Sequence, residues 1–316
     1  MVQAQQRRTI DGREVAAFLR DTGWSGVASI ARIEHGEWSQ AFSFHVASGT
    51  AYVVRFSSLE EDFRKDQLAT TYAAPNLPIP KVVAVGEAFG GFYAIAERAS
   101  GAYLDALDGA HMVRALPSLF SALECMRQAD VSRTSGYGVW DATGNAPQPT
   151  WRGALLVDSD TGNPRIAGWR RRLEQSPTGT VPFETASRKL RELVGGVPNV
   201  RHLVHADLLN YNVLVEDDRV SAVLDWGSAM YGDWVFDIAW LVFWQPWYPA
   251  WAGIDFEREA RLHFERLGLH MPDFAIRMRC CEIAIGVGNQ AYCAFKGESR
   301  WPQLEAVARR TLVLCQ

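Results

Sequence analysis

The first hundred residues combine amphipathic segments with short apolar runs that are broken by Gly and Ser. In DGREVAAFLRDTG, Val15, Phe18 and Leu19 share one face of a predicted helix, and Asp11 stands where it can cap that helix. Three short runs with strand-like alternation follow: SIARIEHG, QAFSFHVASG and AYVVRFSS. Short runs separated by turn residues are typical of an antiparallel meander.

A second helix and a hairpin complete this region. EEDFRKDQLATTYAA has helical character and stops at PNLPIP, where two prolines end it. KVVAVGEAFGGFYAIAERAS holds two more runs around a predicted turn at residues 89–91. Residues 10–98 are therefore predicted to form an α+β unit of five strands, with a helix inserted after the third strand.

Helical patterns dominate from about residue 102. MVRALPSLFSALECMRQA is amphipathic, FETASRKLRELVGG ends at paired glycines, and FEREARLHFERLG is the clearest helix further on. Residues 133–182 are rich in Gly, Pro, Thr and Asp, which predicts a long excursion with a short helix near 165–174. The chain is thus expected to be α+β with a small antiparallel-sheet lobe at 1–98 and a mainly helical lobe at 99–316.

Charge and composition exclude several classes of protein. The 316 residues carry a net charge of −4, and the longest basic run is Arg170-Arg171-Arg172, whereas nucleic-acid binding needs a concentrated basic surface. The five cysteines are odd in number and contain no CxxC, which favours buried thiols over disulfides or a metal site. Because the sequence shows neither a secretion signal nor an apolar run long enough to cross a membrane, a cytoplasmic location is expected. A monomer is also expected.

Polar side chains interrupt the apolar pattern in the segment HLVHADLLNYNVLVEDDRVSAVLDWG. LVHAD ends in His205 and Asp207, NVLVED begins at Asn212, and SAVLDW carries Asp225 at the end of its apolar run. A turn at the intervening DDR would bring Asn212 and Asp225 to the same end of a hairpin. Asp207 would lie on the loop that leads into this hairpin.

These three oxygen-bearing side chains suit phosphoryl transfer. Mg²⁺ takes oxygen ligands, so an amide oxygen and a carboxylate can hold it beside a nucleotide's phosphates, while a metal-free carboxylate accepts a hydroxyl proton. Protein kinases use a catalytic Asp, an Asn five residues later and a metal-binding Asp after the next strand. Each residue alone would more often be a turn or cap residue, but Asp207, Asn212 and Asp225 together have the kinase order and spacing.

The motifs HxDxxxxN, hhhDW and GDxxxDIA resemble the aminoglycoside phosphotransferase and choline-kinase-like branch of the kinase fold. The segments GEWSQAFSFHV, YVVRF, LPIPKV, ADVSRTSGYG and FWQPW are similar to the hygromycin-phosphorylating members of that family, and the likeness runs from about 34 to 247. The resemblance implies a bilobal protein-kinase-like fold, ATP and Mg²⁺ as cofactors, and an aminoglycoside such as hygromycin B as the acceptor that is inactivated.

The resemblance also implies roles for single residues. Asp207 would be the catalytic carboxylate, and Asn212 and Asp225 would hold magnesium. Arg55 stands where most kinases carry a third-strand Lys, and Asp66 on the following helix would be its acidic partner. A strand-edge surface charge for Arg55 and a solvated helix face for Asp66 remain open alternatives.

Other candidates surround this centre. Nucleotide contacts are expected from the phosphate-covering loop and from the backbone between the lobes, at Ser39, Glu97 and Ala99. Structural support of the catalytic loop is expected from His205 and from two acids at the start of the next helix, Asp233 as its N-cap and Asp237 as a brace. Acceptor contacts are expected from Asn210, Trp244, Trp247 and Glu282, although the tryptophans also fit a core stripe and surface acids are common.

Two alternative functions stay open. The chain would be a kinase of another small alcohol, such as a different aminoglycoside, a macrolide or a choline-like metabolite, or a nucleotide-binding pseudokinase without catalysis. The intact set of Asp207, Asn212 and Asp225 argues against the pseudokinase.

Overall fold

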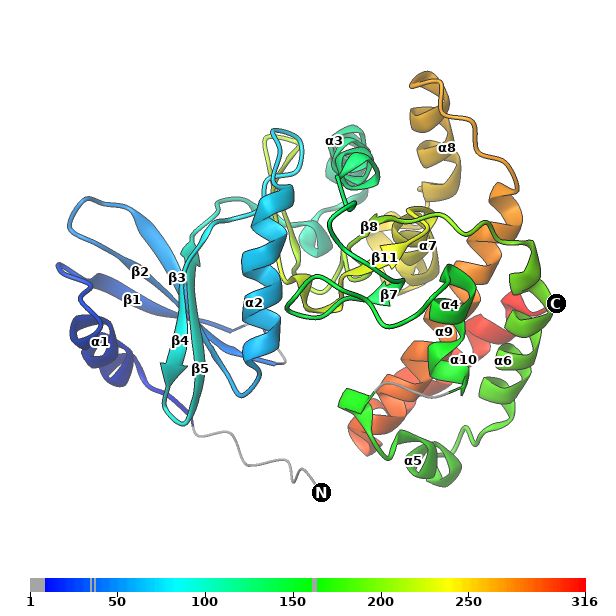
Figure 1. Cartoon of the computed structure of the whole chain (residues 1–316), viewed down its shortest axis with the longest axis horizontal. Coiled ribbons are helices and arrows are strands. Elements are labelled where there is room, and N and C mark those ends of the chain that lie inside the picture. The colour runs from blue at the N-terminus through cyan, green and yellow to red at the C-terminus, as the bar shows by residue number, and fades with distance from the viewer. Residues whose placement is uncertain (1–8, 35, 37, 161–163) are drawn as a thin grey trace.

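The computed structural model describes residues 9–34, 36, 38–160 and 164–316. Figure 1 shows a sheet lobe built from the N-terminal residues beside a larger, mainly helical lobe. The predicted α+β organisation in two lobes is confirmed, whereas the lobe boundary at residue 98 stays a prediction. No helix within the described ranges is long and apolar enough to cross a membrane.

The N-terminal lobe contains one antiparallel sheet with the strand order β1-β2-β3-β5-β4. The strands are β1 (Ala28–Ile33), β2 (Gln40–His45), β3 (Ala51–Ser57), β4 (Val82–Ala88) and β5 (Gly91–Glu97). Helix α2 (Glu60–Ala69) lies between β3 and β4 in sequence, so the five predicted strands and the inserted helix are confirmed. In Figure 1, α2 stands between the sheet and the helical lobe.

Helix α1 (Gly12–Asp21) covers the other face of this sheet. The backbone N–H groups of Arg13 and Glu14 donate to Asp11 Oδ1 at 2.8 and 2.9 Å, and the Glu14 carboxylate accepts from the Asp11 N–H at 3.0 Å. This reciprocal capping box fixes the helix start. Val15 and Leu19 are buried against the apolar face of the sheet, as their spacing predicted.

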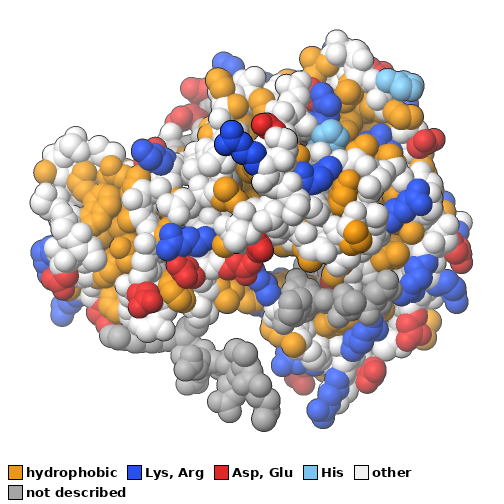
Figure 2. All heavy atoms as spheres, viewed as in Figure 1, with side chains coloured by type: hydrophobic (Ala, Val, Ile, Leu, Met, Phe, Trp, Pro, Cys, Tyr) orange, Lys and Arg blue, Asp and Glu red, His pale blue; other side chains and the backbone are white. Residues whose placement is uncertain are grey.

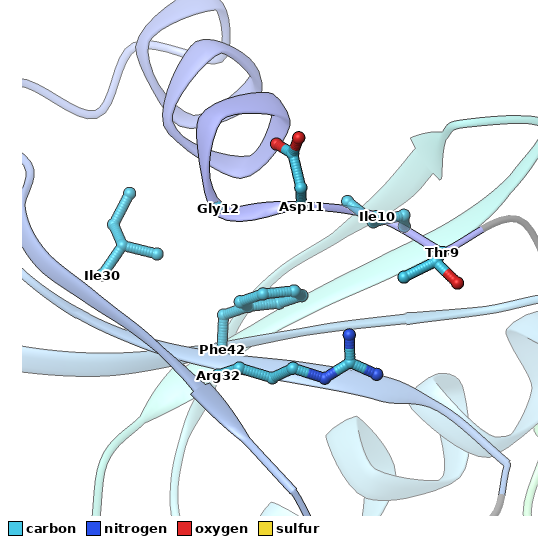
Figure 3. A pocket seen from close by; sticks show the side chains of 7 residues that line it. All are labelled: Thr9, Ile10, Asp11, Gly12, Ile30, Arg32 and Phe42. Carbon is cyan, nitrogen blue, oxygen red and sulfur yellow. The ribbon is translucent and has the colours of Figure 1, made fainter.

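A hollow of about 290 Å³ lies beside the start of α1, with Ile30, Arg32 and Phe42 of the sheet opposite (Figure 3). The Asp11 carboxylate on its rim already accepts two backbone N–H groups of α1. The hollow lies at the α1 end of the sheet lobe, on the far side of the sheet from α2 in Figure 1. It is therefore not a candidate for the kinase-like site.

The C-terminal lobe packs its helices around the long α9. Its helices are α3 (Gly109–Gln128), α4 (Trp151–Asp160), α5 (Trp169–Gln175), α6 (Val181–Leu193), α7 (Val235–Trp244), α8 (Phe256–Arg266), α9 (Phe274–Lys296) and α10 (Trp301–Leu314). Helices α4, α5, α6, α7 and α10 all contact α9. One large core includes the apolar sides of these helices.

Helix α4 was not predicted from the sequence. The excursion at 133–182 contains the expected short helix as α5, but also α4, whose segment includes Gly153 and several polar residues. Trp151 and Leu155 of α4 are buried in the core of the lobe. Tertiary burial of these two side chains therefore stabilises a helix whose local pattern is weak.

Two small sheets carry the centre of the lobe. One has the order β10-β9-β6, with β6 (Ala102–Tyr103), β9 (Val213–Glu216) and β10 (Arg219–Val223). The other has the order β7-β11-β8, with β7 (Gly138–Val139), β8 (His202–Val204) and β11 (Met230–Gly232). The turn predicted between β9 and β10 is confirmed, since Asp217 and Asp218 have φ values of 50° and 60°, as tight hairpin turns require.

A buried ion pair fastens the start of α7 to α9. Asp233 accepts from Arg277 Nε and Nη2, both at 2.7 Å, and the two side chains are 0% and 5% exposed. Trp234 occupies the N-cap position of α7, which corrects the prediction that Asp233 would be the N-cap. Trp234 already has helical backbone angles, and Asp233 precedes it in the ion pair, with its Oδ1 also accepting from the Val235 N–H at 3.2 Å.

Replacing Arg277 by Ala is expected to lower the free energy of unfolding by about 3–5 kcal/mol, because Asp233 would stay buried without its partner. Urea unfolding followed by tryptophan fluorescence measures this loss. Arg309→Ala is the control, since Arg309 pairs with Glu305 at the surface and such pairs contribute less than about 1 kcal/mol. Equal losses in the two variants would contradict the stabilising role of the buried pair.

Candidate active site

The β9–β10 hairpin brings Asn212 and Asp225 to the same end. Val213 pairs with Val223, and the Leu224 N–H donates to the Asn212 carbonyl at 2.7 Å, which extends the pairing by one residue. Asp225 follows immediately, in a left-handed conformation with φ 57°. The antiparallel register therefore places the two predicted metal ligands side by side.

Asp207 joins them from the preceding loop. Asn212 Nδ2 donates to the Asp207 carbonyl at 2.8 Å and to its Oδ2 at 3.1 Å. Asn210 Nδ2 donates to the other carboxylate oxygen, Oδ1, at 2.7 Å. Two side-chain amides thus fix the orientation of the Asp207 carboxylate.

The pKa of Asp207 is raised to about 7, chiefly by burial; the negative charges of Asp225 and Asp105 contribute to this rise, and the bonds from Asn210 and Asn212 oppose it. A carboxylate with a pKa near neutrality is able to accept a proton and to release it again. Asp207 is therefore suited to acid–base chemistry beside the end of the β9–β10 hairpin.

The residues present fit a magnesium ion. The amide nitrogen of Asn212, Nδ2, donates both of its bonds to Asp207. The amide oxygen of Asn212, Oδ1, therefore remains as a possible metal ligand. Among the described residues, the Asp225 carboxylate accepts only a long bond, from the Gly227 N–H at 3.4 Å. An amide oxygen and a carboxylate are ligands that Mg²⁺ accepts alongside phosphate oxygens and water.

The loop that carries Asp207 has a strained backbone. Ala206, Asn210 and Tyr211 have φ values of 63°, 65° and 68°, and none of them is Gly. Such residues cost on the order of 1–3 kcal/mol each and persist where surrounding contacts hold them. The carboxylate of Asp237 holds the first of them, since it accepts from the N–H groups of His205 and Ala206 at 2.9 and 2.8 Å.

His205 is fully buried beneath this loop. Its Nε2 lies 2.9 Å from the Leu224 carbonyl, and its Nδ1 accepts from the Asp207 N–H at 3.3 Å. These partners require a neutral ring with its proton on Nε2. Burial lowers the pKa of His205 to about 4, so the ring stays neutral at pH 7 and ties the Asp207 loop to the end of β10.

Arg55 and Asp66 form an ion pair between β3 and α2. The other carboxylate oxygen of Asp66 accepts from the Trp226 N–H at 2.8 Å. Arg55 also lies over the Phe63 ring, 5.1 Å from its centroid. Asp66 therefore connects the predicted phosphate-side cation to the residue that follows Asp225, and it is buried instead of lying on a solvated helix face.

Lys65 is a functional candidate that the sequence did not reveal. It is 0% exposed, its Nζ donates to the Gly227 carbonyl at 2.6 Å, and it lies 4.7 Å from the centroid of the Trp140 ring. Burial, together with the nearby Arg165, lowers the pKa of Lys65 to about 8. The run EEDFRKDQ gave no signal, because charges at this density usually lie on a solvated helix face.

Further ion pairs join α2 to the helical lobe. Arg165, on a 3₁₀ turn at Pro164–Ile166, contacts Glu61 Oε2 at 2.8 Å and Asp62 Oδ1 at 2.7 Å. Figure 2 shows acidic and basic side chains gathered together near the junction of the two lobes. Helix α2 is thus held electrostatically against the lobe that carries the Asp207 loop.

The predicted nucleotide contacts lie at the expected places in the fold. Ser39 directly precedes β2, in the loop that follows β1, while His35 and Glu37 of that loop lie outside the described residues. Glu97 ends β5 and donates its N–H to the Lys81 carbonyl at 3.0 Å. Ala99 follows in the segment that leads from β5 to β6. The nucleotide roles of these residues stay predictions.

The predicted acceptor contacts are placed less favourably. Trp244 is buried and packs on Trp247, with ring centroids 4.9 Å apart, so its larger part belongs to the core. Glu282 is 6% exposed and pairs with Arg310 at 3.2 Å, which gives it an internal cation as its partner. Asn210 alone of this group touches Asp207. Their roles toward an acceptor stay predictions.

Comparison with known proteins agrees with this geometry. The sequence profile of the phosphotransferase enzyme family, APH, matches residues 29–270. The chain is 33% identical over 273 residues to hygromycin-B 4-O-kinase of Escherichia coli, which covers 85% of this chain and 75% of that protein.

Solved structures give the same result. The crystal structure of aminoglycoside phosphotransferase APH(4)-Ia superposes with a TM-score of 0.82 at 30% identity, covering 96% of this chain and 98% of that one. A thermostable mutant of that enzyme, in a ternary complex with AMP-PNP and hygromycin B, superposes with a TM-score of 0.81 at 30% identity over 95% and 97% of the two chains. A spectinomycin phosphotransferase at 10% identity shares the fold, with a TM-score of 0.61 and coverage of 97% and 99%.

The buried His205 predicts a pH dependence of stability. Its pKa is about 4 in the folded protein and about 6.5 when exposed, so the unfolded chain binds more protons between these values. The free energy of unfolding should therefore fall as the pH drops from 6.5 to 4, by up to about 3 kcal/mol from this group. Urea unfolding at pH 7 and pH 5 should show a smaller loss for His205→Gln than for the wild type.

His270→Gln is the matched control, because His270 is exposed. It should keep the wild-type loss between pH 7 and pH 5. A wild-type loss in His205→Gln as well would show that His205 is not the buried neutral group described above.

Proposed function

Because the chain belongs to the phosphotransferase enzyme family, we propose that it transfers the γ-phosphoryl group of ATP to a hydroxyl of an aminoglycoside, with hygromycin B or a close analogue as the acceptor. The single observation that carries this proposal is the Asp207 carboxylate, which two amides orient beside the hairpin end formed by Asn212 and Asp225. This is the geometry that kinases use to aim a hydroxyl at a phosphate.

Asp207 is the proposed catalytic residue. Its carboxylate would accept a hydrogen bond from the acceptor hydroxyl and take the proton as the oxygen attacks phosphorus. The bonds from Asn210 and Asn212 fix the direction of attack, so positioning contributes most of the rate.

The hairpin end would also hold the metal ion that accompanies the phosphates. Asn212 and Asp225 would hold Mg²⁺, which when bound offsets the negative charge of the phosphate oxygens. Arg55, held by Asp66, would place a second positive charge near the phosphates. Its planar guanidinium has five N–H donors in a fixed arrangement, and those not bonded to Asp66 could contact phosphate oxygens.

The adenine would lie against the segment between the lobes. The Glu97 N–H is already bonded to Lys81, so Glu97 would contribute its carbonyl and Ala99 its N–H to the adenine edge. Ser39 would reach a phosphate from the loop between β1 and β2. A donor and an acceptor on neighbouring backbone positions match the two polar groups of that edge.

The acceptor class rests on likeness to relatives. The E. coli protein named hygromycin-B 4-O-kinase and the structure in complex with hygromycin B both cover most of this chain at about 30% identity. Aminoglycosides are cationic, and the net charge of −4 suits such a ligand. Asn210, Trp244, Trp247 and Glu282 are the proposed acceptor contacts, with Asn210 next to the catalytic carboxylate.

Asp207→Asn is expected to lower kcat by about 10²–10⁴-fold, because the amide cannot accept the hydroxyl proton. Nucleotide binding should stay close to that of the wild type. ADP release with a saturating acceptor measures turnover, and calorimetric titration with AMP-PNP measures binding. Asp217→Asn is the control, since Asp217 is an exposed acid of the same hairpin whose left-handed backbone Asn tolerates. Wild-type turnover in Asp207→Asn would refute the assignment.

A panel of acceptors tests the substrate class. Hygromycin B, two other aminoglycosides, a macrolide and choline are supplied to the wild type with ATP and magnesium, and phosphorylated products are identified by mass spectrometry. Hygromycin B is expected to give the highest kcat/KM. Preferred phosphorylation of the macrolide or choline would retain the phosphotransferase and reject the aminoglycoside.

A further inference from the structure

Asp105 reaches the catalytic loop from the segment that follows the connection between the lobes. It lies on a 3₁₀ turn at Leu104–Ala106, directly after β6. Its Oδ1 accepts from the Asn210 N–H at 3.0 Å, and its Oδ2 accepts from the Tyr211 N–H at 2.7 Å. The Tyr248 hydroxyl donates to Oδ1 at 2.7 Å. One carboxylate therefore binds three donors, two of them on the catalytic loop.

The two backbone donors belong to consecutive residues in the left-handed region. Asn210 and Tyr211 have φ values of 65° and 68°, a conformation that Asn tolerates but that Tyr rarely adopts. Both N–H groups point toward the same carboxylate. Without an anion at this point, the loop would lose the contact that offsets its unfavourable backbone.

The same arrangement occurs at the other end of the loop. There, Asp237 accepts from the N–H groups of His205 and Ala206, and Ala206 is also left-handed. Each carboxylate binds two successive N–H groups, one on each oxygen, and such charge-assisted bonds are stronger than neutral ones. The loop is thus held at both ends by acids from different parts of the chain.

The position of Asp105 is itself fixed by aromatic packing. The Tyr248 ring stacks on Trp251 with centroids 4.1 Å apart and an interplanar angle of 15°. Trp251 Nε1 donates to the Leu107 carbonyl at 2.9 Å, two residues beyond Asp105. The segment after α7 therefore holds the turn that presents Asp105 to the loop.

Asn210 connects the Asp105 contacts to the proposed catalytic carboxylate. The Asn210 side chain donates to Asp207 Oδ1 at 2.7 Å, and its starting point is set by the backbone that Asp105 holds. We propose that Asp105 is a positioning residue, which fixes the 210–211 backbone so that Asn210 orients the Asp207 carboxylate. This inference rests on the proposed function of Asp207 and deepens it.

Asp105→Asn tests the proposal, because the amide has one acceptor oxygen in place of two and no charge. The expected result is a fall in kcat on the order of 10²-fold, as small misplacements of a catalytic group produce. The KM for ATP should stay at the wild-type value, because Asp105 bonds to Asn210, Tyr211 and Tyr248 and not to the residues proposed to bind the nucleotide. Asp108→Asn is the matched control, since Asp108 is an exposed N-cap three residues away and Asn caps equally well.

A double-mutant cycle separates positioning from a general structural effect. If Asp105 acts through Asn210, then Asp105→Asn should add little to the loss of kcat caused by Asn210→Ala. Independent, multiplicative losses would overturn the proposal, and so would wild-type kcat in Asp105→Asn. Thermal unfolding of each variant confirms that the loss of kcat occurs in folded protein.

Amide hydrogen exchange of the peptide that covers 206–212 gives a readout that needs no acceptor. Exchange at 210 and 211 should be faster in Asp105→Asn than in the wild type and in Asp108→Asn. Unchanged exchange would overturn the proposal whatever the activity. If the wild type phosphorylates no acceptor, the proposed function fails, and faster exchange would still establish that Asp105 holds the loop.

Discussion

The candidate site depends on carboxylates that bind the backbone N–H groups of a strained loop. Ala206, Asn210 and Tyr211 are left-handed without being Gly, so the loop needs external partners to stay in this shape. Asp237 supplies them at one end and Asp105 at the other. In this strained conformation, the side-chain amides of Asn210 and Asn212 are directed at the carboxylate of Asp207.

A second set of contacts joins the two lobes through α2. Asp66 receives the Trp226 N–H and pairs with Arg55, and the buried Lys65 donates to the Gly227 carbonyl. Both partners lie just after Asp225, so the helix of the small lobe holds the turn that presents the predicted metal ligand. These contacts connect α2 to the turn that directly follows Asp225.

Burial of charge accompanies both sets of contacts. Removal from water raises the pKa of Asp207 and Asp237 to about 7 and lowers those of Lys65 and His205 to about 8 and 4. A buried neutral His205 can accept the Asp207 N–H only while its Nδ1 is unprotonated. The same buried groups whose pKa values are shifted therefore also make the hydrogen bonds that define the shape of the site.

The sequence alone predicted the five strands of the N-terminal lobe, the β9–β10 hairpin, most helices and the convergence of Asp207, Asn212 and Asp225, because apolar periodicity, turn residues and motif spacing are local properties. Only the tertiary structure decided which distant charges meet them. Asp105 in GAYLDALDG and Lys65 in EEDFRKDQ look like ordinary turn and surface residues, and α4 has a weak helical pattern. Their partners lie about a hundred residues or more away in the chain, and packing of the two lobes, which no local pattern encodes, brings them together.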